Sequence, residues 1–464
     1  MDTSFCCSAL AISVVVCVAA AGCAANEHLA MSVDAGFRVD TQPRLPLPYR
    51  QGDATQVDKR AELFYGYNVC CGEKGVAWVL WYDLSDVGGG SRSWSPRDVT
   101  YRIKDFPSSG PGGKARELQT RSTAFRGLPA MVLDQAGNLR LLLEDPVGSA
   151  DLFKTFRISP DLKAEELLQL RDEVSYSVST EALTNMADRR LVLGTVFPVP
   201  GQPGHYFIEG NYRYVRPWDV PAMAGPQPMR RYAVEVKGIK AGRAQPITPF
   251  PADAYGDVAA SAGHYFDANR KGWAVGVYRP VGFDGPNQPV MISLWDGQSW
   301  QAASFNERNL LVPPKEQGEK AWSLRPTVVL LDSHILLFEG RYCFMLAVKQ
   351  KPAGGIGELV WTRGLELDEG NHFCDAVNVG DGAVAVISSD GPAPTFSYLY
   401  CGPEGMSKTE RLAMRAGPSA KSFVIKATSD GVCHLVWHDS VDKTLKHQTL
   451  IRNGGPRQVA PGDG

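Results

Sequence analysis

Several common signatures are missing from this 464-residue chain, and each gap narrows the choice of function. Charge of one sign is not in excess: 48 Lys and Arg against 50 Asp and Glu leave a formal charge of -2, so nothing suggests a nucleic-acid partner, whose phosphates need clustered cations. The lack of a C-x-x-C pair argues against a structural zinc site. Motifs for P-loops, Rossmann turns, EF-hands and nucleophile elbows are also missing, so no cofactor is expected.

Helical patterns are scarce as well. The clearest is L-K-A-E-E-L-L-Q-L, residues 162–170, which could form a short surface helix or, as the alternative, an outer strand with a polar edge. Glycine and proline are plentiful instead, with 47 and 32 residues in a chain that is 44% hydrophobic. This composition is typical of many short strands joined by turns.

The N-terminal residues are expected to direct export. Residues 9–25 are almost entirely small or apolar, and at about 17 residues they are short for a membrane span but suit the core of an export signal. The segment contains A-A-G-C, residues 20–23, which resembles the lipobox of bacterial lipoproteins and implies that Cys23 is lipidated. An envelope lipoprotein, held to the membrane only through a lipid anchor, is expected. Ordinary secretion, or an uncleaved anchor or misassigned start, are the alternatives, and all place the mature protein outside the cytoplasm.

Six cysteines follow this leader, at positions 70, 71, 343, 374, 401 and 433. An even number in an oxidising compartment permits up to three disulfides, but their spacing does not choose among the possible pairings.

One pattern recurs along the chain: an apolar strand, a tight polar turn with glycine, a second apolar strand, and an acidic or proline residue eight positions after the glycine. Two weaker copies lack the glycine. The copies lie near residues 75, 137, 189, 272, 333, 382 and 431, about 59 residues apart on average. Such a period fits a four-stranded blade with its loops, and apolar residues on both faces at mid-strand fit sheets that are covered on both sides.

The sequence therefore predicts an all-β chain with a single β-propeller, for which seven blades are preferred and six or eight stay open. We assign the leader to residues 1–23, a tether and closing strand to 24–60, the propeller to 61–455 and a C-terminal tail to 456–464. Because residues 444–452 are expected to be the third strand of the last blade, a segment within residues 31–40 is predicted to supply the missing strand and close the ring. A monomer is expected.

Near the C-terminus, S-D-G-V-C-H-L-V-W-H-D, residues 429–439, places two histidines beside a cysteine, as in a metal or catalytic cluster. On a strand, His434 and His438 share a face but lie about 13 Å apart, too far to hold one metal ion together. We predict one half-buried and one strand-end histidine, with a role for His438 in a site at the strand end as the alternative.

A ligand site is predicted on the face where the second strands end. These ends are predicted at Asp83, Asp145, Pro198, Pro280, Gly340, Asp390 and Asp439. The loop after Pro198 is dense in aromatic and ionisable residues and supplies His205, Tyr206 and Glu209, of which the carboxylate could act as acid or base. Packing of these aromatics between blades is the alternative. His372 and Asp375, just before an innermost strand, could join the same face.

The stretch F-R-G-L-P-A-M-V-L-D, residues 125–134, and the residues after it up to 145 resemble the opening blade of the sialidase-like, BNR-type propeller superfamily, in which an R-I-P motif precedes the innermost strand. A looser likeness is S-L-R-P-T-V-V, residues 323–329. The resemblance implies that Arg126 and Arg325 point into the central pocket and favour an anionic ligand, which Arg can hold through a bidentate fork. The Asp box departs from its pattern, since S-L-W-D-G-Q-S-W, residues 293–300, has its Asp one place later, and no clear nucleophilic tyrosine with its glutamate is found.

The leading interpretation is an exported, envelope-anchored propeller that binds a glycan or a protein ligand on its top face. Its candidate ligand contacts are Arg126, Asp145, His205, Tyr206, Glu209, Arg325 and His372. The alternative is a carbohydrate-active enzyme, a glycoside hydrolase or polysaccharide lyase acting on an anionic glycan. Hydrolysis needs two carboxyl groups across a cleft, for which Glu144, Asp145, Glu209 and Asp439 are the candidates. A structural component of an envelope assembly is a third possibility.

Overall fold

The computed structural model of the chain describes residues 43–58, 64–72, 75–83, 97–108, 112–122, 130–144, 151–158, 164–171, 189–214, 231–238, 240–241, 245–246, 264–278, 290–295, 297, 299–305, 327–350, 356–391, 393–416 and 423–454. Within these ranges no helix is long and apolar enough to cross a membrane. The leader with Cys23 lies outside them, as does the segment 31–40.

The described strands form seven sheets of four or five strands, with antiparallel pairing. The first three sheets after residue 60 consist of β3 (Phe64–Cys71), β4 (Val76–Asp83), β5 (Arg97–Pro107) and β6 (Arg116–Ser122); β7 (Ala130–Leu133), β8 (Leu139–Glu144), β9 (Asp151–Ile158) and β10 (Ala164–Arg171); and β11 (Arg189–Pro198), β12 (His205–Tyr214), β13 (Arg231–Lys237), β14 (Lys240–Ala241) and β15 (Gln245–Pro246).

The remaining four sheets complete the set. They consist of β16 (His264–Ala268), β17 (Ala274–Tyr278), β18 (Val290–Trp295) and β19 (Trp300–Phe305); β20 (Thr327–Leu330), β21 (His334–Glu339), β22 (Tyr342–Gln350) and β23 (Ile356–Glu366); β24 (Asn371–Asn378), β25 (Ala383–Ser389), β26 (Phe396–Gly402), β27 (Gly405–Met406) and β28 (Glu410–Arg411); and β29 (Phe423–Ala427), β30 (Cys433–His438) and β31 (Leu445–Arg452), with β1 (Tyr49–Gln51) and β2 (Thr55–Asp58).

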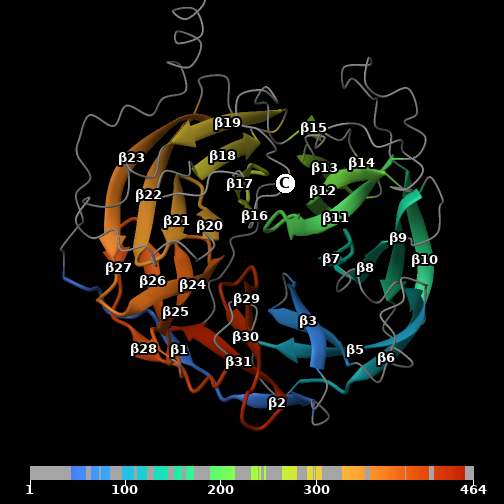
Figure 1. Cartoon of the computed structure of the whole chain (residues 1–464), viewed down its shortest axis with the longest axis horizontal. Helices are drawn as coiled ribbons and strands as arrows, with labels where there is room; N and C mark the ends of the chain where they lie inside the picture. The colour runs from blue at the N-terminus through green and yellow to red at the C-terminus, as the bar shows by residue number, and fades with distance from the viewer. Residues whose placement is uncertain are drawn as a thin grey trace, which may run out of the picture.

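The sheets stand in a ring around a central axis (Figure 1). The first strand of each sheet contacts the first strands of its two neighbours, in the cyclic order β3, β7, β11, β16, β20, β24, β29 and back to β3. These strands therefore line the centre and the other strands extend outward, which is the architecture of a β-propeller. The predicted all-β propeller is confirmed.

Apolar side chains fill the spaces between neighbouring sheets. On β4, Val79 and Leu80 are both fully buried, yet they belong to different clusters: Val79 packs with Val436 and Leu445 of the C-terminal sheet, and Leu80 with Leu141 of the sheet on the other side. Each sheet is thus covered on both faces, which explains why the mid-strand sequences are apolar on both faces rather than alternating.

The recurring glycines lie in the turns between the first and second strands. Gly75, Gly137, Gly272 and Gly431 have φ values of 65°, 76°, 75° and 82°, in the left-handed region that side chains with a Cβ rarely adopt. The repeat in the sequence is therefore a repeat of this tight turn.

The copy of the repeat near residue 189 was expected to be a second strand, and this prediction is wrong. β11 is the innermost strand of its sheet, because it contacts β7 and β16 on either side and pairs with β12. This copy lacks the turn glycine eight positions before its proline, so no local signal distinguishes a first strand from a second strand here. Pro198 consequently lies at the opposite end of the sheets from Asp83. Residues 164–171 form the outermost strand β10 rather than a helix.

The N-terminal and C-terminal segments share one sheet. β1 and β2 both pair antiparallel with β31, which is the third strand of its sheet counted from the axis, as predicted. The strands beside β31 come from residues 49–51 and 55–58 rather than from residues 31–40.

None of the six described cysteines forms a disulfide. Burial raises the pKa of Cys70 to about 12 and that of Cys374 to about 11, so both thiols stay protonated and weakly reactive.

Candidate functional site

A cavity of about 120 Å³ lies on the axis of the ring, at the end where the first strands turn into the second strands. Every sheet contributes to its wall, through Cys71, Leu133, Pro198, Asn269, Leu330, Asn378 and Thr428. The second strands end at the other end of the sheets, where the sequence predicted a site. We call this cavity the axial pocket.

The turns around the axial pocket are held by their own side chains. Asn269 Oδ1 accepts hydrogen bonds from the backbone N–H groups of Lys271 and Trp273, at 3.1 and 3.2 Å, and its Nδ2 donates to the carbonyl of Leu331. Asp134 accepts from the N–H groups two and four residues ahead in the same way. Such turns are rigid before any ligand arrives, because short polar side chains replace missing backbone partners.

Two of the predicted contacts, His205 and Tyr206, line the axial pocket at the start of β12. His205 bonds through Nδ1 to Gln202 Oε1 and through Nε2 to Glu235 Oε1, both at 2.8 Å. Burial would raise the pKa of Glu235, but hydrogen bonds from His205 and Lys237 outweigh it and lower the pKa. His205 is therefore a bonded member of the wall.

Tyr206 and Glu209 are more deeply placed. Tyr206 is 1% exposed, and burial raises its pKa to about 12 against the opposing charge of Arg140. Glu209, three residues further along β12, is fully buried and cannot meet a ligand in the pocket. Arg126, Asp145, Arg325 and Cys23 lie outside the described residues.

His372 lies at the other end of the ring, at the start of β24. Its Nδ1 is 3.1 Å from Asp390 Oδ1 and its Nε2 is 2.6 Å from Ser388 Oγ. The order resembles a nucleophile, base and acid, but Ser388 is only 4% exposed and Asp390 is largely in solvent. The arrangement ties the start of β24 to the end of β25, and the hydroxyl is almost fully buried.

Replacing His372 by Ala is expected to lower the free energy of unfolding by about 1 to 3 kcal/mol, because the buried Ser388 hydroxyl loses its partner. Urea unfolding followed by tryptophan fluorescence measures the change. The exposed neighbour Glu369, replaced by Ala, is the control and should change stability by less than about 0.5 kcal/mol. Equal, small effects of both variants would show that the bond is not stabilising.

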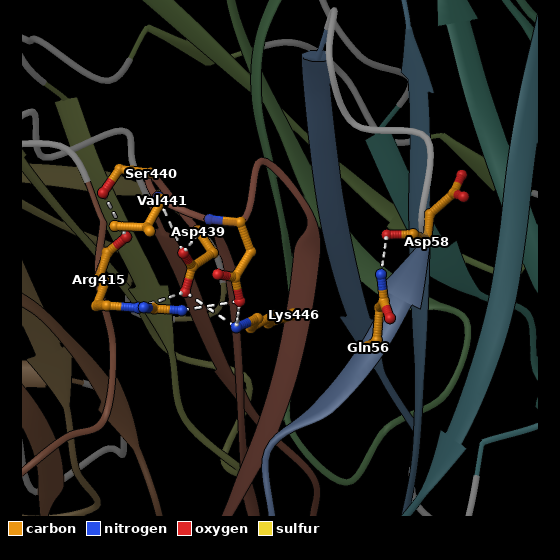
Figure 2. Close-up of polar contacts among 8 residues, drawn as sticks. Gln56, Asp58, Arg415, Asp439, Ser440, Val441 and Lys446 are labelled. Atoms are coloured by element: carbon orange, nitrogen blue, oxygen red, sulfur yellow. Dashed lines mark hydrogen bonds and ion pairs between the residues drawn. The ribbon is translucent and has the colours of Figure 1, made fainter.

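Asp439 has a structural environment rather than a catalytic one (Figure 2). Its Oδ2 lies 3.2 Å from Arg415 Nε and 3.1 Å from Lys446 Nζ, and its Oδ1 accepts from the backbone N–H groups of Val441 and Asp442. Burial would raise its pKa, but these donors outweigh it and lower the pKa to about 2. Figure 2 also shows Gln56 of β2 donating to the carbonyl of Asp58.

His434 is fully buried, not half-buried as predicted, and its partner is not His438. Its Nδ1 lies 2.9 Å from His447 Nε2, and the His447 ring stacks on Phe106 of the next sheet, with 4.1 Å between ring centroids. His438 ends β30 and is half-buried.

Two carboxylates, Asp267 and Asp375, lie on innermost strands that run up to the axial pocket, although neither lines the pocket itself. Asp267 Oδ2 accepts from the N–H of Leu330 at 2.8 Å and from Asn378 Nδ2 at 3.3 Å, which joins three innermost strands. Burial raises its pKa to about 6 despite these bonds and the charge of Lys426. Burial likewise raises the pKa of Asp375 to about 6, again opposed by Lys426.

Of the two carboxylates, only Asp375 was predicted from the sequence as a candidate site residue. A usable signal exists: the dipeptide Asp-Ala occurs at 267–268 and at 375–376, in innermost strands that are otherwise largely apolar and each five residues before a turn glycine. Lys426 carries no such signal, and neither does Arg270, which follows Asn269 in the pocket wall. The described residues contain no group of three or more His, Cys, Asp or Glu side chains that could hold a metal ion.

No protein-family model and no curated protein matches this chain. Among solved structures, an α-L-arabinofuranosidase of Fusarium graminearum is similar at 11% identity, with 87% of this chain and 98% of that chain covered and a TM-score of 0.41. The Aleuria aurantia lectin with α-methyl-L-fucoside gives 9% identity, 86% and 96% coverage and a TM-score of 0.38. The β-propeller domain of the Trilobed protease of Pyrococcus furiosus is similar at 7% identity, with 87% of this chain and 100% of that chain covered and a TM-score of 0.42. At these scores the likenesses carry no argument about ligand or activity.

Proposed function

We propose that this chain is an exported β-propeller that binds a glycan, with one sugar residue seated in the axial pocket. The observation that carries the proposal is the size and enclosure of the pocket: about 120 Å³, walled by turns of all seven sheets. Pockets for drug-sized ligands are on the order of 300 to 1,000 Å³, so this one suits a single residue or end group of a longer ligand. The rest of the ligand would lie over the turns.

The finer architecture is part of the proposal. The seven sheets and the pairing of β1 with β31 support a seven-bladed ring closed by an N-terminal strand. The leader supports an envelope lipoprotein lipidated at Cys23, with a lipid anchor as the only membrane attachment. A monomeric propeller is also part of the proposal. A protein ligand that inserts one side chain is compatible with the same pocket.

One observation favours a second candidate, a glycoside hydrolase. Asp267 and Asp375 are two carboxyl groups with raised pKa values on innermost strands that run up to the pocket, and raised pKa values suit acid and base catalysts. Against it, Asp267 Oδ2 is already occupied by two protein donors. Release of new reducing ends from a bound oligosaccharide, lost in Asp375→Asn, would favour the enzyme; binding without cleavage favours the lectin-like function.

Replacing Pro198 by Trp tests the binding site. Pro198 is exposed at the pocket wall, so an indole there is expected to fill the entrance without disturbing the core and to weaken glycan binding at least about tenfold. Glycan-array screening followed by calorimetry gives the affinity. Ala136→Trp is the matched control, because Ala136 is an exposed turn residue on the same face outside the pocket wall. A ligand that binds both variants equally well would place the site elsewhere.

A further inference from the structure

Most polar side chains in the wall of the axial pocket are already bonded within the protein. Asn269, Asn378, Gln202 and His205 each use both polar ends on neighbouring turns or strands. A ligand in the pocket can therefore hydrogen-bond only with the few polar groups that keep an unused donor or acceptor within the described part of the protein.

Arg270 is one of these groups, and it reaches across the pocket. It follows β16, yet its Nη2 donates to the carbonyl of Ser429, which follows β29, at 3.0 Å. Two other sheets lie between β16 and β29 in the ring, so the guanidinium bridges the mouth rather than an adjacent pair of turns. It makes no ion pair within the described ranges, and its other N–H groups are left for a ligand.

Lys426 is the second group. It does not line the pocket itself but directly precedes Ala427, which does, and its side chain is exposed although it lies on an innermost strand. Its charge acts on Cys70 and Cys71, which also line the pocket, and on Asp267 and Asp375. No ion pair involves Lys426 among the residues that the structure describes. The only acidic residue in the described wall is Asp332, which is exposed at the rim.

We infer that the axial pocket recognises an oxyanion on the sugar residue, a carboxylate or a sulfate ester, held by the guanidinium of Arg270 and the ammonium of Lys426. The inference rests on the proposed function and narrows its ligand class. In the described wall Arg270 keeps N–H donors for a ligand and the acidic Asp332 is exposed at the rim, while Lys426 adds positive charge next to the wall. Arg and Lys donors form the stronger, charge-assisted hydrogen bonds with such oxygens.

The two carboxylates give this recognition a pH signature. Asp267 and Asp375 are ionised above pH 6 and weaken the positive potential near Lys426; below pH 6 they become neutral. The affinity for an oxyanion should thus rise about three- to tenfold from pH 7.5 to 5.0, where sugar carboxylates and sulfates stay charged. Affinity for a neutral sugar should not change.

The test uses the full mature chain and three oligosaccharides that differ only at the terminal residue: a uronic acid, a neutral hexose, and that hexose with one sulfate ester. Calorimetry is expected to show at least tenfold tighter binding of one or both acidic ligands. Preference between them identifies carboxylate or sulfate as the natural oxyanion. Arg270→Gln and Lys426→Met should each remove most of this preference, and Asp375→Asn should remove most of the rise at low pH.

Lys271→Met is the matched control, because Lys271 is a neighbouring cation whose ammonium is already engaged, packing over Trp273 and donating to the carbonyl of Asp332. Equal binding of neutral and acidic ligands, blocked by Pro198→Trp, would overturn the inference and leave the proposed function standing. Acidic binding that Lys271→Met weakens as much as Arg270→Gln would also overturn it, since only net charge would then matter. If Pro198→Trp weakens the binding of no ligand, both the inference and the proposed function are wrong. Thermal unfolding of each variant shows whether a loss reflects misfolding.

Discussion

Deletion of residues 43–58 is expected to unfold the propeller or to lower its free energy of unfolding by more than about 5 kcal/mol. The segment forms β1 and β2, which cover the outer edge of β31. Tyr49 is 2% exposed and lies between the last two sheets. Its hydroxyl donates to the carbonyl of Gly431, and the hydroxyl of Tyr398 donates to the backbone carbonyl of Tyr49. Val57 is 6% exposed in the cluster between the last sheet and the first. One buried aromatic and one buried valine are each worth about 1.5 to 3 kcal/mol before any hydrogen bond is counted.

Circular dichroism and urea unfolding of the shortened chain measure the effect. A deletion of residues 24–42 is the control, because it removes a similar length and leaves β1 and β2 in place. A synthetic peptide of residues 43–58 should restore part of the stability in a concentration-dependent way, since its binding is linked to folding. A shortened chain that unfolds at the same urea concentration as the control would show that these strands do not hold the ring together.

The fold could be predicted because its signals are local. A glycine at positive φ between two apolar strands recurs at Gly75, Gly137, Gly272 and Gly431, and burial of both faces shows in adjacent apolar residues such as Val79 and Leu80. The copy near residue 189 has no glycine eight positions before Pro198, and its strand, predicted to be a second strand, is the first strand of its sheet; the glycines at positive φ, Gly201 and Gly204, lie in the turn after Pro198. The turn glycine, rather than the hydrophobic pattern, therefore identifies which strand of a sheet a given segment forms.

The site could be predicted only in part because it is assembled by closure of the ring. Arg270 and Ser429 are 159 residues apart in sequence and meet across the axis. Lys426 acts on carboxylates of two other innermost strands. His205 was found because aromatic density marked its segment, although the sequence put it on the opposite face. No local pattern encodes which turn faces which across a ring.

The buried pair His434 and His447 should destabilise the folded ring as the pH falls below 6.5. Burial lowers the pKa of His434 to about 4, with Asp430 opposing, and lowers the pKa of His447 to about 3, with the charges of His434 and Lys104 adding to the effect. An unfolded histidine titrates near 6.5. The pair's contribution is therefore complete above pH 6.5 and is lost as the pH falls toward 4 and 3, by a total on the order of 5 to 8 kcal/mol.

Asp267 and Asp375 act in the opposite direction over the same range. Their folded pKa values, about 6, exceed the unfolded value, so their contribution is complete below about pH 3.9 and is lost as the pH rises through 6, by on the order of 3 kcal/mol each. The two effects nearly cancel, and the wild-type free energy of unfolding should change little between pH 7.5 and 4.5.

Replacing both histidines, His434→Leu with His447→Phe, is expected to expose the carboxylate effect alone. Because both partners of the hydrogen bond become apolar and Phe can keep the stacking on Phe106, the change should cost little at pH 7.5. Urea unfolding from pH 7.5 to 4.5 should then show the variant gaining several kcal/mol as the pH falls. His438→Gln, at the half-buried end of the same strand, is the control and should keep the flat wild-type profile. A double variant whose profile stays as flat as the wild type's would mean that the imidazole pair does not resist protonation in the folded ring.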